Sequence, residues 1–168
     1  MHNLKKLLII ISLITLTGCG FKPIYAKKNT TGNLAVVESF SQVRIGNIPN
    51  REGQFLRNIL VDKIYTKGYP NKVKYFLTVG IIENKYSYGI KTDAVATRAN
   101  IRFTANFILT EASTNKVLLK APIYVNSSYN ILDSSYETFV AEKDAKERAL
   151  TEVANNIVHR LSIFFSKE

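Results

Sequence analysis

The chain has 168 residues, a formal net charge of +10 and a single cysteine. This length suits one domain built around one hydrophobic core. Hydrophobic residues make up 46% of the chain and charged residues 21%, a mixture too apolar for a disordered protein. A single cysteine excludes an intrachain disulfide, so packing alone must hold the fold.

The first 18 residues have the features of an export signal. Lys5 and Lys6 precede an apolar run over residues 7–16, shorter than the roughly 20 residues that a permanent membrane-spanning helix needs. The sequence LTGC at residues 16–19 then matches the bacterial lipobox. An ordinary secretory signal is the simpler alternative, but the one cysteine lies where a lipobox requires it. We therefore expect cleavage before Cys19 and lipid attachment to its thiol.

The residue after the cysteine bears on the destination of the protein. An aspartate there commonly retains Gram-negative lipoproteins at the inner membrane, whereas this chain has Gly20. We therefore expect an outer-membrane protein, firmly held by the three acyl chains of a mature lipoprotein. The expected organisation is a signal peptide over residues 1–18, a lipidated polar tether over 19–33 and a single domain over 34–168.

The domain begins with a predicted strand and helix. Residues 34–45 are rich in Val, Ile and Phe and predict a strand. Apolar residues at helical spacing predict a helix over residues 51–67, with Asn50 as its N-cap and Gly68 as part of its stop signal. The apolar face of this helix comprises Phe55, Leu56, Ile59, Leu60 and Ile64.

Three strands and a helix complete the pattern. Alternating apolar residues predict strands over residues 73–81, 101–109 and 117–125, with a tight turn at Thr114 and Asn115 before the third. Pro122 favours an edge position or a bulge for that strand. A long helix then carries an apolar stripe: Leu150, Val153, Ala154, Ile157, Val158, Leu161, Phe164 and Phe165.

The element order β-α-β-β-β-α predicts an α+β fold. It is a two-layer sandwich, in which a mainly antiparallel four-stranded sheet packs against two helices. We expect Phe103 and Phe107 to face both helices. Their expected neighbours in the core are Leu56, Leu60, Ile157 and Leu161.

No pattern in the sequence indicates catalysis. His159 is the only histidine left after removal of residues 1–18, and no cysteine or histidine cluster has the spacing of metal ligands. Nucleophile elbows, phosphate loops and zinc-protease motifs are missing from the sequence. The acids of the last helix read as solvated partners of bases one turn away: Glu142, Asp144, Glu147 and Glu152. We expect no enzyme, no cofactor and no metal.

The basic excess concentrates near the middle strands. Six cations there are interleaved with tyrosines: Lys72, Lys74, Lys85, Lys91, Arg98 and Arg102. Such a surface suits nucleic acid, but an exported lipoprotein meets little of it, so we expect no nucleic-acid partner. Anionic glycolipid is the more fitting ligand, since ammonium and guanidinium groups pair well with phosphate and carboxylate. The alternative is that these cations bind no specific ligand and simply lie on a solvent-exposed face of the sheet.

Four stretches of the mature chain resemble the lipopolysaccharide-assembly lipoprotein family LptE in its alphaproteobacterial form. They are CGFKPIYA after the lipobox, IPNREGQFLRNIL at the first helix, YSYGIKTDAVATRANI before the second long strand, and SSYNILDSSYETFVAEKDAKERAL before the last helix. The resemblance implies a two-layer α/β domain that plugs the outer-membrane β-barrel LptD. It also implies that the two proteins together place lipopolysaccharide in the outer leaflet.

The resemblance also suggests a binding site. Lys91 lies where the family has a basic residue in a strand-linking loop, and Arg98 and Arg102 follow in the same block. We expect these three residues to contact lipopolysaccharide. The alternative is that an arginine pairs with the barrel wall or with an acid such as Glu83. A second reading of the whole protein, as a pilotin or an accessory subunit of another outer-membrane transport machine, stays open.

Overall fold

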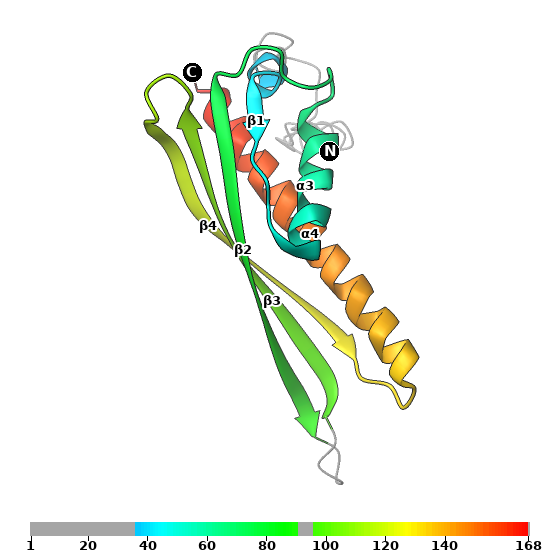
Figure 1. The fold of residues 1–168 in the computed structure, drawn as a ribbon. Coiled ribbons are helices and arrows are strands. Elements are labelled where there is room, and N and C mark those ends of the chain that lie inside the picture. Colours follow the sequence, from blue (N-terminus) through cyan, green and yellow to red (C-terminus); the bar gives the residue numbers. More distant parts are fainter. Residues whose placement is uncertain (1–35, 91–95, 168) are drawn as a thin grey trace, which may run out of the picture. The chain divides into compact units, whose positions relative to one another are not determined.

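The computed structural model describes residues 36–90 and 96–167 of the chain. A first strand, β1 (Val43–Ile45), is followed by helix α3 (Asn50–Ile64). The long strands β2 (Tyr75–Ile90), β3 (Ala96–Glu111) and β4 (Val117–Asn130) come next, and helix α4 (Ser135–Phe165) is last (Figure 1). The predicted order of strand, helix, three strands and helix is confirmed.

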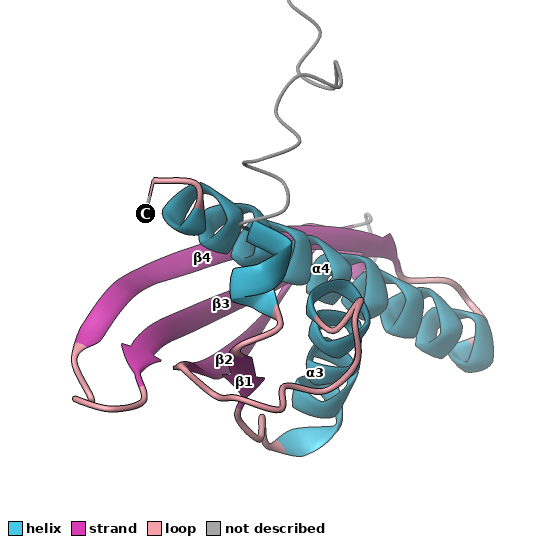
Figure 2. Cartoon of the chain, turned by 90° about the horizontal axis from the view of Figure 1, so that it is seen from above, coloured by secondary structure: helices cyan, strands magenta, loops and turns pink. Residues whose placement is uncertain are grey.

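The strands form one sheet in the order β1-β2-β3-β4. Strands β2, β3 and β4 are antiparallel neighbours, whereas β1 is parallel to β2 because α3 intervenes between them. Strand β4 is therefore an edge strand, as Pro122 indicates. Helices α3 and α4 lie on the same side of the sheet, so no helix of the described residues covers the other face (Figure 2). The predicted two-layer α+β architecture is confirmed.

The first strand is much shorter than predicted. Residues 36–40 form a helical turn and only Val43–Ile45 are extended, so a strand over 34–45 is wrong for the residues described. The sheet register gives the reason: Val43 lies opposite Tyr75, which is the first residue of β2. Residues before Val43 therefore have no strand to pair with. Phe40 instead packs its ring edge-on against Phe165 of α4, with centroids 5.8 Å apart.

The predicted apolar face of α3 is confirmed, but its predicted N-cap is wrong. Leu56, Leu60 and Ile64 are fully buried. The helix begins at Asn50 itself, which has a φ of 68°, and Pro49 occupies the cap position without a side-chain hydrogen bond. The last helical residue is Ile64, and Gly68 forms the turn beyond it with a φ of 94°, which glycine adopts without strain.

Strands β2, β3 and β4 extend well beyond the predicted segments. Residues 82–90 are mostly polar and show no alternation, yet they continue β2 because β3 pairs with them as far as Ile90. The far halves of these strands are therefore held by main-chain pairing rather than by a continuous apolar pattern. The turn between β3 and β4 contains Asn115, whose φ of 57° is tolerated by asparagine.

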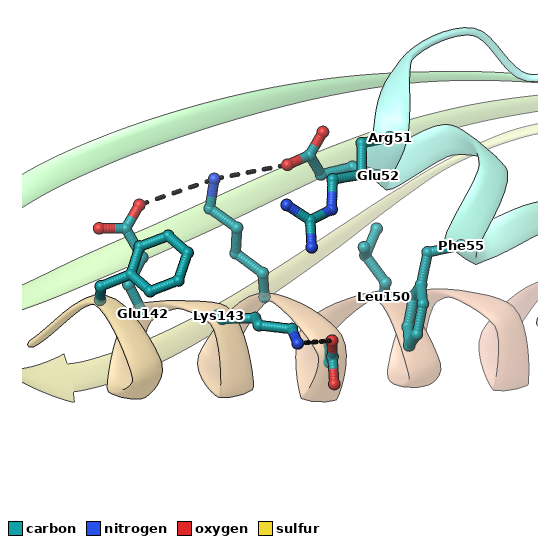
Figure 3. A pocket seen from close by; sticks show the side chains of 9 residues that line it. Arg51, Glu52, Phe55, Glu142, Lys143 and Leu150 are labelled. Carbon is teal, nitrogen blue, oxygen red and sulfur yellow. Dashed lines mark ion pairs between the residues drawn. The ribbon is translucent and has the colours of Figure 1, made fainter. Parts of the chain in front are cut away.

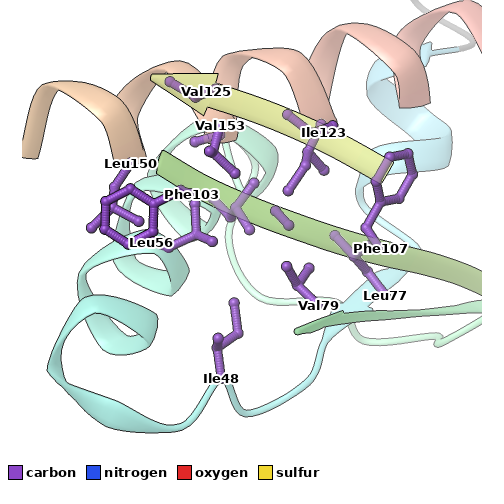
Figure 4. Packing of buried hydrophobic residues seen from close by; sticks show 14 of the residues in the cluster. Ile48, Leu56, Leu77, Val79, Phe103, Phe107, Ile123, Val125, Leu150 and Val153 are labelled. Carbon is purple, nitrogen blue, oxygen red and sulfur yellow. The ribbon is translucent and has the colours of Figure 1, made fainter. Parts of the chain in front are cut away.

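The core lies between the sheet and the helices (Figure 4). Phe103 and Phe107 are fully buried there with Leu56, Leu60, Ile157 and Leu161, as predicted. The odd-numbered residues of β3 point to this core, so Thr104 lies on the opposite face. Helix α4 supplies the longest apolar stripe, and the Ser134 hydroxyl accepts a hydrogen bond from the Glu137 N–H at 3.4 Å at its start. Within the described ranges, no helix has the length and apolarity needed to cross a membrane.

Candidate functional site

The predicted glycolipid contacts lie in the half of β3 farthest from the β3–β4 turn. Arg98 and Arg102 are exposed, and both point away from the helices because the odd-numbered residues around them face the core. Lys91 falls outside the described residues. Two of the three predicted residues are thus on one sheet face, four positions apart, which corresponds to about 13 Å along a strand.

Neighbouring strands hold Arg102 in place. Its Nε–H donates to Oδ1 of Asn126, which lies directly across on β4, at 2.8 Å. This bond leaves the terminal guanidinium nitrogens turned toward solvent for an anion. Asn100, between the two arginines, has a buried Oδ1 without a hydrogen-bond partner among the described residues. An oxygen of that kind suits a donor supplied by a ligand.

The alternative that an arginine pairs with Glu83 is not supported by the structure. Glu83 points to the helix side of the sheet, where its carboxylate binds Lys146 of α4 at 2.8 Å. The arginines point to the opposite side of the same sheet. They are therefore available to an external partner.

An ion network lies on the helix side behind these strands (Figure 3). Lys85 of β2 donates to Glu142 of α4 at 2.5 Å, and the Tyr129 hydroxyl of β4 donates to the same carboxylate oxygen at 2.8 Å. Lys146, one turn further along α4, lies 3.6 Å from Glu142 and 3.6 Å from Glu52 of α3. The network therefore joins α4 to two strands and to the other helix.

The network shifts the pKa values of Lys85, Glu142 and Lys146 in the direction that favours the charged form of each group. The hydrogen bond to Glu142 raises the pKa of Lys85 above its ordinary value. Burial alone would raise the pKa of Glu142, but the hydrogen bonds from Lys85 and Tyr129 and the charges of Lys85 and Lys146 outweigh it, so this pKa is lowered. Burial likewise works against the charge on Lys146, yet its acidic neighbours raise its pKa overall. These groups stay ionised at neutral pH and act as a clamp rather than as acid or base catalysts.

The position of Glu142 corrects a prediction. Asp144 pairs with Arg148 and Glu147 pairs with Lys143, as expected for solvated residues one turn apart. Glu142 instead is about three-quarters buried, with 23% of its side chain exposed, and its strongest partner is 57 residues away in the chain. No local spacing could reveal that contact, because only the packing of α4 on β2 creates it.

An open pocket of about 110 Å³ lies between the start of α3 and the first half of α4. Its lining combines the apolar side chains of Phe55, Phe139 and Leu150 with charged side chains of both signs. Lys143 and Lys146 of the lining pair with acids of the same lining, as the Lys143–Glu147 contact in Figure 3 shows. Arg51 is the one lining cation without an ion pair to a described residue. Among the described residues there is no cluster of acids, histidines or cysteines that could hold a metal ion.

The model of the lipopolysaccharide-assembly family LptE matches residues 40–161 of the chain. This range runs from the helical turn before β1 to the last turns of α4, so it contains the whole sheet and both arginines. A search of curated proteins gave no match.

Solved structures share the fold. A structure named as a lipoprotein of Caulobacter crescentus is 22% identical, with a TM-score of 0.67, and the match covers 80% of this chain and 98% of that one. A minor lipoprotein of Acinetobacter baumannii is 14% identical over 73% of this chain and 92% of its own, with a TM-score of 0.59. The rare lipoprotein B of Shewanella oneidensis is 7% identical over 72% and 92%, with a TM-score of 0.56. At these identities the comparison establishes a common fold.

Proposed function

Because this chain belongs to the lipopolysaccharide-assembly family LptE, we propose that it is the lipoprotein subunit of an outer-membrane lipopolysaccharide translocon. In this role it plugs and supports an LptD-type β-barrel and binds lipopolysaccharide during insertion into the outer leaflet. The observation that carries the proposal is the family match over residues 40–161, which spans every strand and helix described from β1 to α4 except the last turn of α4. The role is one of binding, without catalysis.

The glycolipid contact is assigned to the outer half of the helix-free sheet face, which is the half farthest from the β3–β4 turn. Arg98 and Arg102 are exposed there, and Arg102 is oriented by Asn126. Guanidinium groups bind phosphates and carboxylates through paired hydrogen bonds, and lipopolysaccharide carries both kinds of anion. Charge-assisted contacts of this kind contribute roughly 1.5–3 kcal/mol each when partly shielded from water, and less when exposed. Lys91, outside the described residues, is proposed as the third contact.

The membrane attachment is proposed to be a lipid on Cys19. That residue and the tether over 19–33 lie outside the described residues, so the support comes from the lipobox sequence. Anchoring by several acyl chains would hold the domain at the outer membrane without a spanning helix. This geometry leaves the domain free to enter a barrel lumen.

The glycolipid contact is tested with a double charge reversal, Lys91→Asp with Arg98→Asp, in the full-length lipoprotein. We expect it to assemble with the barrel protein in detergent extracts but to recover at least about tenfold less lipopolysaccharide, since one lost charge-assisted contact corresponds to about that factor. Arg160→Asp reverses an exposed cation on α4 and is the matched control, with unchanged recovery.

Two other results would contradict the assignment. Survival of glycolipid binding together with failure of barrel assembly would place Lys91 and Arg98 in the protein interface instead. If the wild-type chain did not recover a barrel protein in stoichiometric amount, the translocon role itself would be contradicted. Circular dichroism of both variants must match the wild type, so that misfolding does not imitate either result.

A further inference from the structure

The helix-free face of the sheet has a distinct composition. It comprises Arg44 of β1 and the even-numbered positions of the three long strands: Phe76–Tyr86, Arg98–Thr110 and Lys120–Asn130. We call this set the free face. Nine of its 20 residues are asparagine, threonine or serine, so it offers many hydrogen-bond donors and acceptors beside a few cations and apolar side chains.

The charges on the free face are of one sign. Arg44, Arg98, Arg102 and Lys120 are the ionised groups among its described residues. The acids of β2 and β3, Glu83 and Glu111, occupy odd-numbered positions and therefore point to the helix side. An uncharged or acidic polar surface can approach this face without burying two like charges against each other.

The middle of the free face also exposes apolar surface. Ile82 lies opposite Thr104, and Thr104 lies opposite Tyr124, so the three form one row across β2, β3 and β4. Ile82 is 58% exposed and Tyr124 is 65% exposed. A largely solvated tyrosine at mid-length of an edge strand, in one row with an exposed isoleucine, is the kind of side chain that anchors protein interfaces.

Size and spacing favour a protein over a lipid headgroup at this row. Three strands about 4.8 Å apart and about a dozen residues long give the whole free face an area of about 600 Å², of which the outer end with Arg98 and Arg102 is assigned to glycolipid. The rest is smaller than the roughly 800 Å² per partner of a standard protein interface, so it provides the centre of a protein contact rather than all of it. Lys120 lies opposite Ile108, six residues along β3 from Arg102, which is about 20 Å. Cations that far apart do not converge on one phosphate, but they can meet acids spread over a wall.

We propose that the row Ile82–Thr104–Tyr124, together with Lys120 four residues away on β4, is the docking surface for a partner protein that presents a polar wall of uncharged and acidic side chains. The inference rests on the proposed function and extends it, because it assigns the barrel contact to the middle of the free face. The glycolipid contact stays at Arg98 and Arg102, nearer the outer end of the same face. The α4 side of the molecule does not make the central contact.

The first test places a photoreactive phenylalanine derivative at position 124 of the full-length lipoprotein in intact cells. The matched control is position 136, where Tyr136 is 75% exposed on α4. We expect position 124 to give an adduct with a protein heavier than a second copy of this chain, and position 136 to give at least tenfold less of it. The inference would be overturned if position 124 formed an adduct only with glycolipid, only with a second copy of this chain, or only within the chain. Equal amounts of the heavy adduct from positions 124 and 136 would overturn it as well.

The second test measures partner recovery from detergent-solubilised outer membranes. The double variant Tyr124→Ser with Ile82→Thr should recover at least tenfold less barrel protein than the wild type, whereas Tyr136→Ser should recover the wild-type amount. Thermal unfolding should be unchanged, since both altered side chains are more than half exposed. Full barrel recovery by the double variant overturns the docking surface while leaving the translocon role intact. A heavy adduct at position 124 with a protein other than a barrel keeps the docking surface and contradicts the translocon role.

Discussion

Glu142 shows how one residue can link distant elements. Its carboxylate accepts hydrogen bonds from Lys85 of β2 and Tyr129 of β4, and Lys146 lies 3.6 Å away on its own helix. A partly buried carboxylate with several donors is more stabilising than a surface ion pair, because fewer of its interactions are screened by water. It holds the first half of α4 against β2 and β4, the two strands that flank the arginine-bearing β3.

The Glu142 contact predicts a pH dependence of stability. A carboxylate with a lowered folded-state pKa contributes stability above its ordinary value of 4.5, and this contribution disappears as pH falls through the lower folded-state value. Glu142→Gln should therefore lower the free energy of unfolding by about 1 kcal/mol at neutral pH. The difference from the wild type should shrink in acid. Urea denaturation at several pH values measures both quantities.

Glu147→Gln is the matched control for that measurement. Glu147 pairs only loosely with Lys143, at 3.8 Å, and both side chains are about half exposed. We expect its loss to change stability by no more than a few tenths of a kcal/mol. Equal and pH-independent effects of the two substitutions would show that the Glu142 network does not stabilise the fold.

At the scale of elements, contacts with the rest of the chain can require a residue that is a poor helix former in the middle of a helix. Gly53 is buried in α3, where alanine would ordinarily stabilise a helix by about 1 kcal/mol. A Cβ at this position would lie 2.8 Å from the carbonyl oxygen of Ile48 and 2.8 Å from its Cγ2. The glycine therefore lets the segment before α3 pass close to the helix.

Gly53→Ala should accordingly destabilise the protein, by about 1–3 kcal/mol, because the clash with Ile48 involves backbone that cannot move freely. Asn58→Ala, at an exposed position of the same helix, should instead be neutral or stabilise by up to about 0.7 kcal/mol. Chemical denaturation of the two variants gives the comparison. A stabilising effect of Gly53→Ala would mean that the chain around Ile48 shifts at little cost.

The strands also show that the local sequence pattern predicts only part of an element. The alternation over residues 101–109 identified both β3 and its buried face, because every second residue is apolar. The polar continuation of β2 to Ile90 was not predicted, and neither was the helical turn before β1. In both cases the partner strand decides the outcome: β3 pairs with residues 82–90, whereas β2 begins opposite Val43 and bonds no further back than the carbonyl oxygen of Gln42.

At the scale of the whole molecule, the proposed lipid anchor would decide where the free face can act. A mature chain that began at a lipidated Cys19 would stay at the membrane surface, close to any barrel in that membrane. The proposed docking and glycolipid contacts need that proximity, since tethering raises the effective concentration of the partner.

The lipid anchor predicts a defined mature mass. Mass spectrometry of the membrane-extracted protein should show the loss of residues 1–18 and three acyl chains on the new N-terminus. Cys19→Ala should leave the signal uncleaved or the protein unanchored, because no thiol is present to take the lipid. Fractionation of cells expressing each form separates these results. Detection of the wild-type protein at full length with a free thiol would contradict the anchor.

The sequence by itself determined the features that depend on near neighbours in the chain. The 3.6-residue and two-residue periods of apolar residues specified α3, α4 and the central parts of the long strands, with their buried faces. Pro122 also narrowed the position of β4 to an edge or a bulge, and the strand order shows the edge. For the site, the basic block with Arg98 and Arg102 was identified from composition and from the resemblance to a family.

Only the tertiary structure decided which residues far apart in the chain come together. The pairing of Lys85 with Glu142, the row of Ile82, Thr104 and Tyr124, and the length of β1 all depend on strand register and on how α4 lies across the sheet. The physical reason is that a periodic pattern specifies which side of an element is buried. The partner, and the position along that partner, are selected by the packing of the complete core.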